Sequence, residues 1–226
     1  MRGGIFLFDS LSYSFSAILA RFIVLFFAIT VHEFSHGYAA YKLGDPTAKY
    51  SGRLSLNPLA HLDPFGALCM LLFRFGWAKP VPINPMYFRN RKRDTAITAL
   101  AGPVANILLA LIAVILLAPL IVFVLPNHGN FITEFIYRLL IECIGVNMSF
   151  AAFNLIPFPP LDGSKVLGIF LSAENYNTLL QYERFGFPIL ILLSFTGLLS
   201  NAINFITTPI AAFLQFVLNL LIRLLG

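Results

Sequence analysis

The chain has 226 residues, of which 58% are hydrophobic and only 11% are charged, and its mean hydropathy is +0.83. A soluble domain carries about 25% charged residues, so the composition excludes an ordinary soluble protein and predicts an integral membrane protein. The net charge of +5 does not indicate a nucleic-acid partner, because nine of the fifteen Lys and Arg residues lie between positions 42 and 94. Such clustering is typical of the positive-inside bias and predicts a cytoplasmic loop.

The first long apolar run, from about Phe15 to Tyr41, is long enough to cross about 30 Å of hydrocarbon. Near its C-terminal end it contains the pattern His-Glu-Phe-Ser-His, with His32, Glu33 and His36. On a helix, residues four apart lie on one face, one turn from each other, and this spacing lets two imidazoles bind one zinc ion. Glu33 can then act as a general base on a water molecule that the zinc makes acidic.

The apolar setting makes this motif a functional candidate. Ionisable side chains are costly to bury in a membrane and are therefore candidate functional residues by default. The alternative is a helix that ends at the membrane interface, where the same polar residues are simply hydrated.

The region that follows is rich in turns and basic residues. Gly44-Asp45-Pro46 should end the first helix, and the partly alternating stretch from Ala48 to Leu56 favours a short strand. The apolar stretch from Phe65 to Trp77 is too short for a comfortable span and predicts a re-entrant or interfacial segment.

Further apolar runs predict additional spans. Two of them are separated by a turn near residues 126–130. The charge-free stretch from Phe185 to Ile222 has apparent breaks at Ser200-Asn201 and at Thr207-Thr208-Pro209. The expected spans are 96–125, 131–156, 186–200 and 204–225.

Together these patterns predict an all-α polytopic bundle of about five to six spans, with a short re-entrant or β-like segment between the first and second core spans. We expect residues 1–226 to form one membrane-embedded domain, with a core at about 15–170 and a C-terminal helical hairpin at about 185–226.

A catalytic zinc usually has three protein ligands and one open position. The candidates for the third ligand are Asp162, His61, Asp63 and His128. Asp162 is the best placed, because it follows a proline-rich break at the end of a span, where irregular backbone is tolerated if it lines a cavity or packs on protein. The alternative is that Asp162-Gly163 is an ordinary turn, and spacing alone leaves both interpretations open.

Three motifs occur in an order that resembles the site-2 protease family of intramembrane zinc metalloproteases. They are His32 to His36, Ala101-Gly102-Pro103-Val104-Ala105-Asn106, and Asn154 to Gly163, which reads NLIPFPPLDG. Two further stretches, Asn57 to Gly66 and Gly76 to Pro85, look like a compact bacterial or archaeal branch of that family, without a PDZ domain.

The resemblance covers about residues 15–170 and implies one zinc ion per chain on His32, His36 and Asp162, with Glu33 as the general base. It implies substrate contacts for Asn154, and Asn106 is a second substrate-binding candidate because its amide lies in an otherwise apolar span.

The implied activity is endopeptidase cleavage of transmembrane helices within the bilayer. The implied partners are transmembrane protein substrates and the lipid bilayer. The clustered basic residues predict a multi-pass inner (plasma) membrane protein whose active site faces the cytoplasmic side. The oligomeric state is left open.

Two other functions compete with proteolysis: a membrane metal-ion carrier, and an inactive homologue that binds membrane helices without cutting them. The intact Glu33 disfavours both, because neither function needs a general base beside the two histidines.

Overall fold

The computed structural model describes residues 15–63, 66, 79–126 and 130–226. The predicted re-entrant segment at 65–77 therefore lies outside the described residues, apart from Gly66. Within the described residues every regular element is a helix, which confirms the all-α class.

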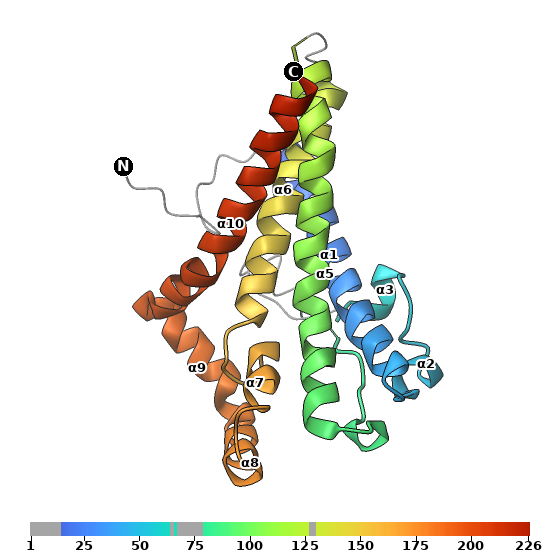
Figure 1. The fold of residues 1–226 in the computed structure, drawn as a ribbon, viewed down its shortest axis with the longest axis vertical. Helices are drawn as coiled ribbons and strands as arrows, with labels where there is room; N and C mark the ends of the chain where they lie inside the picture. The colour runs from blue at the N-terminus through green and yellow to red at the C-terminus, as the bar shows by residue number, and fades with distance from the viewer. Residues whose placement is uncertain (1–14, 64–65, 67–78, 127–129) are drawn as a thin grey trace.

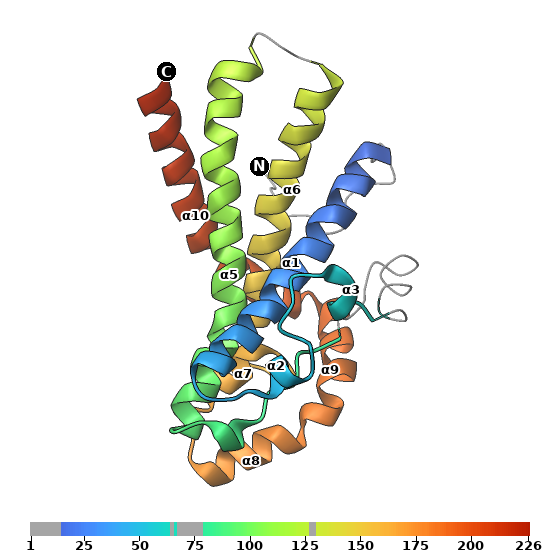
Figure 2. The ribbon, with the colours of Figure 1, turned by 90° about the vertical axis from the view of Figure 1, so that its right-hand side faces the viewer.

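Four long helices form an elongated bundle: α1 (Phe15–Lys42), α5 (Arg91–Pro119), α6 (Phe131–Asn154) and α10 (Leu198–Leu225), with α5 extended by the π-helical turn η2 (Leu120–Val124) (Figure 1). Each of the four is long and apolar enough to cross a membrane, and they are the only such helices among the described residues. Helix α5 contacts the other three, and α1 crosses it obliquely (Figure 2). The total of five to six spans stays a prediction, as does the single-domain assignment.

The shorter helices lie around the lower part of the bundle in Figures 1 and 2, and we call the end that carries α2, η1, α7 and α8 the lower end. These elements are α2 (Thr47–Tyr50), α3 (Pro58–His61), η1 (Pro85–Tyr87), α7 (Asp162–Leu167), α8 (Ala173–Gln181) and α9 (Glu183–Thr196).

The strand expected between Ala48 and Leu56 is wrong. This stretch begins as α2 and continues without regular structure. The buried carboxylate of Asp45 accepts hydrogen bonds from the backbone N–H of Thr47, at 2.9 Å, and of Asn84, at 2.6 Å. This local bonding stabilises a turn followed by a helical start, and it outweighs the weak alternation.

The predicted break points near the C-terminus are also wrong. Helices α9 and α10 are separated at Gly197, which has a φ of 77° that glycine adopts readily. Helix α10 then continues through Pro209, next to hydroxyls of Thr207 and Thr208 that bond to carbonyls of the preceding turn. The hairpin therefore consists of a 14-residue helix and a 28-residue helix, and only the second can span a membrane.

Small residues allow α1, α5 and α6 to pack closely. Ala20 and Ala28 of α1 and Ala110 and Ala113 of α5 are almost completely buried. Helices α1 and α6 are also joined by an ion pair between Arg21 and Glu142, at 3.7 Å, so that both charges have a partner. The three helices thus form a tightly packed support for the polar residues nearer the lower end.

Candidate metal centre

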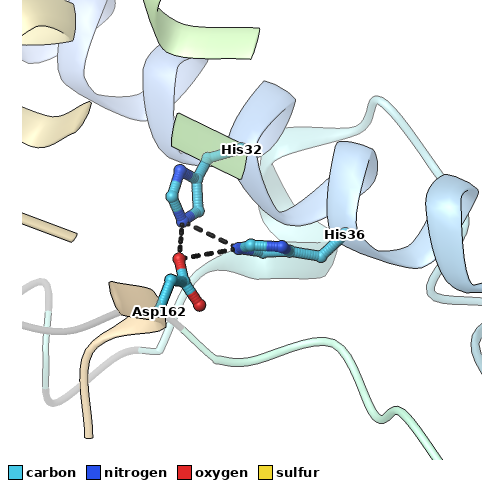
Figure 3. A group of neighbouring side chains, drawn as sticks. All are labelled: His32, His36 and Asp162. Carbon is cyan, nitrogen blue, oxygen red and sulfur yellow. Dashed lines mark hydrogen bonds and ion pairs between the residues drawn. The ribbon is translucent and has the colours of Figure 1, made fainter. Parts of the chain in front are cut away.

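Two histidines of α1 and the first residue of α7 meet in one cluster (Figure 3). The Nε2 atoms of His32 and His36 are 3.0 Å apart. The Oδ2 atom of Asp162 lies 3.2 Å from the first and 3.1 Å from the second. All three side chains are buried, and among the described residues this is the only group of His, Cys, Asp and Glu side chains placed to share a metal ion.

The spacing of these three atoms fits a zinc ion. A tetrahedral site with ligand bonds near 2.0 Å has ligand–ligand edges of about 3.3 Å, close to the observed triangle. Asp162 Oδ2 is buried and makes no hydrogen bond, although buried polar atoms normally have a partner. A bound cation would supply that partner.

The hydrogen bond on the far side of each imidazole ring determines which ring nitrogen carries the proton. The Nδ1 atom of His32 is 2.6 Å from Asn106 Oδ1, and the Nδ1 atom of His36 is 2.7 Å from the backbone oxygen of Thr98. Carbonyl oxygens only accept hydrogen bonds, so each Nδ1 must donate one. In the neutral rings both Nε2 atoms then carry a lone pair directed at the cluster, as metal ligation requires.

Helix α5 closes the cluster at Gly102, where the chain has no side chain. A Cβ atom added there would lie 2.5 Å from His36 Nε2 and 2.6 Å from His32 Cε1. No atom can occupy that position without displacing the two rings. Glycine is therefore required at this point, and the motif that the sequence places at Ala101–Asn106 lines the cluster directly.

Asp162 reaches the cluster because the chain folds back on the end of α6. The segment after Asn154 ends the helix and turns at residues 155–161, after which α7 begins and packs against α5. A Cβ on Gly163 would collide with the backbone oxygen of Leu155, so this close return also needs glycine. The other oxygen of the carboxylate, Oδ1, is 3.6 Å from the Lys165 ammonium.

The environment keeps Asp162 ionised. Burial by itself raises the pKa of a carboxyl group, but when the rings of His32 and His36 are protonated, their N–H groups and charges outweigh burial and hold the pKa of Asp162 well below its ordinary value. A bound cation would take the place of those protons and would keep Asp162 as a carboxylate, the form that binds a metal.

Glu33 is placed by the segment that precedes η1. Its Oε2 atom accepts a hydrogen bond of 2.8 Å from the backbone N–H of Val81. Val81 lies between two prolines, and its buried side chain packs on the α1 surface beside Gly37. The segment thereby orients one carboxylate oxygen, while the other makes no hydrogen bond within the described part of the chain.

The two predicted substrate-binding residues have different surroundings. Asn154 is half-buried at the last turn of α6, and its amide donates only to the Phe150 carbonyl, at 3.0 Å. Asn106 is fully buried, and its contacts are with His32, Ala28 and Asn147. The substrate-binding role of Asn106 stays a prediction, and its hydrogen bond to His32 joins it to a residue of the cluster.

The other candidate third ligands lie elsewhere. His61 is buried and its Nε2 atom bonds to the Ser55 carbonyl, at 2.7 Å. Asp63 accepts a hydrogen bond from the backbone of Gly66, and His128 lies outside the described residues. Of the four candidates, Asp162 is thus the one that the structure brings to the two histidines.

Two supporting residues were missed by the sequence analysis. Thr98 acts through its backbone carbonyl, which carries no sequence signal. Asn147 is a buried amide in the middle of α6, and an amide inside an apolar span needs a partner, so its position in the sequence could have identified it.

Comparison with known proteins places the chain among bacterial metalloproteases. It is 37% identical over 188 residues to the Bacillus subtilis (strain 168) protein named "Putative zinc metalloprotease YwhC", covering 83% of this chain and 85% of the relative. It is 30% identical to the Mycolicibacterium smegmatis protein named "Putative zinc metalloprotease Rip2" (77% of this chain, 66% of the relative) and 26% identical to the Mycobacterium tuberculosis H37Rv protein of that name (79% and 66%).

No family model and no solved structure matches the chain. The likeness to YwhC nevertheless extends over most of both chains. The chain therefore belongs to the zinc metalloprotease family of these bacterial proteins and is a zinc-dependent hydrolase.

Proposed function

We propose that this protein is an intramembrane zinc endopeptidase of the site-2 protease type that cleaves the transmembrane helices of other membrane proteins. The observation that carries the proposal is the position of the cluster. His32 and His36 lie within an apolar helix long enough to span a membrane, and Asp162 meets them beside α5, a second such helix. A peptide bond must enter this helical bundle to reach the cluster.

The residues of the site divide the chemistry between them. Zinc bound by His32, His36 and Asp162 would supply a Lewis acid that polarises the scissile carbonyl and makes water more acidic. Glu33 takes a proton from the attacking water and returns it to the leaving amine. The backbone N–H of Val81 keeps the Glu33 carboxylate oriented for both transfers.

The substrate helix has to unwind locally, since its carbonyls are otherwise hydrogen bonded within the helix. Asn154, at the last turn of α6, can hydrogen-bond to the exposed backbone of the unwound segment. Of its two N–H groups, one donates to Phe150, and the other has no partner within the described residues.

The active site should face the cytoplasm. The cluster lies toward the lower end, where α1 ends and α5 begins, and the described basic residues between 42 and 94 lie from the end of α1 to the first turn of α5. The positive-inside bias therefore orients the lower end inward. Labelling of an Arg91→Cys variant from each side of intact cells tests this orientation, and modification from outside would reverse it.

The experiment for the activity uses the purified chain in proteoliposomes with a panel of single-span substrates. Glu33→Gln keeps the shape of the side chain and removes the base. We expect it to retain zinc and to lose cleavage by at least the 10²–10⁴-fold typical of a general base. Full turnover by Glu33→Gln would reject the mechanism, and cleavage confined to soluble peptides would reject the intramembrane substrate class.

A further inference from the structure

A line of buried side-chain amides connects the metal cluster to the middle of α6. It runs from His32 on α1 to Asn106 on α5 and then to Asn147 on α6. Asn106 and Asn147 have 0% and 1% of their surface exposed, and His32 has 3%. The hydrogen bonds along the line are 2.6 Å from His32 to Asn106 and 2.8 Å from Asn106 to Asn147.

The hydrogen bond at the Asn147 end of this line sets the direction of the others. The amide nitrogen of Asn147 lies 2.9 Å from the backbone oxygen of Cys143, and a carbonyl can only accept. Asn147 therefore presents its oxygen to Asn106. The amide nitrogen of Asn106 donates to that oxygen and, at 3.2 Å, to the backbone oxygen of Ala28. The oxygen of Asn106 is then left facing His32.

This fixed direction has a consequence for the metal ligand. An oxygen at 2.6 Å requires a proton on His32 Nδ1, so the lone pair of the neutral ring is on Nε2, which faces Asp162 and His36. If the Asn106 amide turned over, its N–H would face Nδ1 and the ring proton would move to Nε2. That tautomer cannot bind a metal through Nε2.

We propose that Asn147 is a positioning residue for the metal site: through Asn106 it holds His32 in the tautomer that binds zinc, although Asn147 itself does not contact the cluster. Groups that orient a metal-bound histidine typically change metal affinity 10–100-fold when removed. Asn147 acts one hydrogen bond further from the metal site. When Asn147 is replaced, the weaker hydrogen bond from Asn106 to Ala28 would still favour the correct orientation of the Asn106 amide. We therefore expect an effect near the lower end of that range.

The test measures zinc affinity of the full chain in nanodiscs by competition with a chelator, so that no substrate or activity is needed. Asn147→Leu should weaken zinc binding about 10-fold, and Asn106→Leu 10–100-fold. Because Asn147 acts through Asn106, the double variant should bind zinc no more weakly than Asn106→Leu alone. In the metal-free protein, nitrogen NMR of His32 should report mainly the Nδ1-protonated ring in the wild type and a mixture of tautomers in Asn147→Leu.

The matched control is Thr207→Val on α10. This residue is equally buried, at 1% exposure, and its substitution also removes a side-chain hydrogen bond, but its hydroxyl donates to carbonyls of its own helix, at Ile203 and Asn204. Its zinc affinity should equal that of the wild type. Asn147→Ala provides a second variant that removes the amide without crowding, in case leucine does not fit.

Three results would overturn the proposal: unchanged zinc affinity in Asn147→Leu and Asn147→Ala, losses that multiply in the double variant, or unfolding of both Asn147 variants while Thr207→Val folds. The inference rests on zinc binding at His32, which is part of the proposed function. Different results would refute the metal site and the protease activity. A wild-type chain that binds no zinc refutes the metal site, whereas a chain that binds zinc and cleaves nothing refutes only the protease.

Discussion

The two sides of the metal cluster are built in different ways. On the histidine side, the rings of His32 and His36 are held by hydrogen bonds to a side-chain amide and to a backbone carbonyl of α5. On the aspartate side, Asp162 makes no such bond through the oxygen that faces the histidines, and its position comes from the way the backbone of residues 155–163 packs. The first side depends on polar pairing and the second on steric fit.

The packing on the aspartate side extends to the C-terminal helices. Ile156 and Leu161, at the two ends of the turn, are buried with Leu190 of α9. A Cβ on Gly186 of α9 would collide with the backbone oxygen of Pro159. Helix α9 is too short to span the membrane, yet it forms the surface on which the Asp162 segment rests. The C-terminal hairpin thus contributes to the site without adding a ligand.

The largest effect is expected from Gly102→Ala, which tests the histidine side. The added methyl group would occupy the space between the two imidazole rings, so zinc content should fall below detection while the helix, whose propensity improves, still folds. Gly145→Ala on α6 is the matched control, because its Cβ meets no atom within 4 Å. Metal content and thermal unfolding are measured for both variants. A Gly102→Ala protein that holds one zinc per chain would contradict the close approach of Gly102 to the two rings.

A smaller and different effect is expected from Gly186→Ala, which tests the aspartate side. Here the methyl group meets backbone rather than a ligand, so the turn must shift at a cost of about 1–3 kcal/mol, the usual range for overpacking. We expect a lower unfolding temperature together with weakened, but still measurable, zinc binding. If Gly186→Ala unfolded like Gly145→Ala and kept the zinc affinity of the wild type, then α9 would not support Asp162.

The histidine side was the more predictable of the two from the sequence. The spacing of His32 and His36 on a helix fixes their relative position by periodicity alone, and helix α1 has nearly the predicted bounds. Asn106 was identified as polar in an apolar span, but its hydrogen bonds to His32 and Asn147 were not predicted. Pairing between helices depends on their rotation about their axes, and spacing within one helix does not determine that rotation.

The aspartate side depended on contacts that are distant in sequence. The proline-rich break before Asp162 indicated an irregular segment, and the resemblance to a known family selected this residue from four candidates. The support from Gly186 could not be predicted, because a glycine in an apolar helix has many explanations. The predicted break between α9 and α10 was misplaced for the same reason. The chain turns at Gly197, whereas the more polar Ser200-Asn201 pair lies inside α10.

The most direct test of the account is zinc content and zinc X-ray absorption of the wild type, Asp162→Asn and His61→Ala. We predict one zinc per wild-type chain, with two nitrogen ligands and a carboxylate oxygen from the protein. Asp162→Asn should lose affinity and alter the ligand shell, while His61→Ala should keep both, because His61 bonds to Ser55 away from the cluster. Loss of zinc from His61→Ala, with full retention by Asp162→Asn, would contradict the assignment of the metal centre.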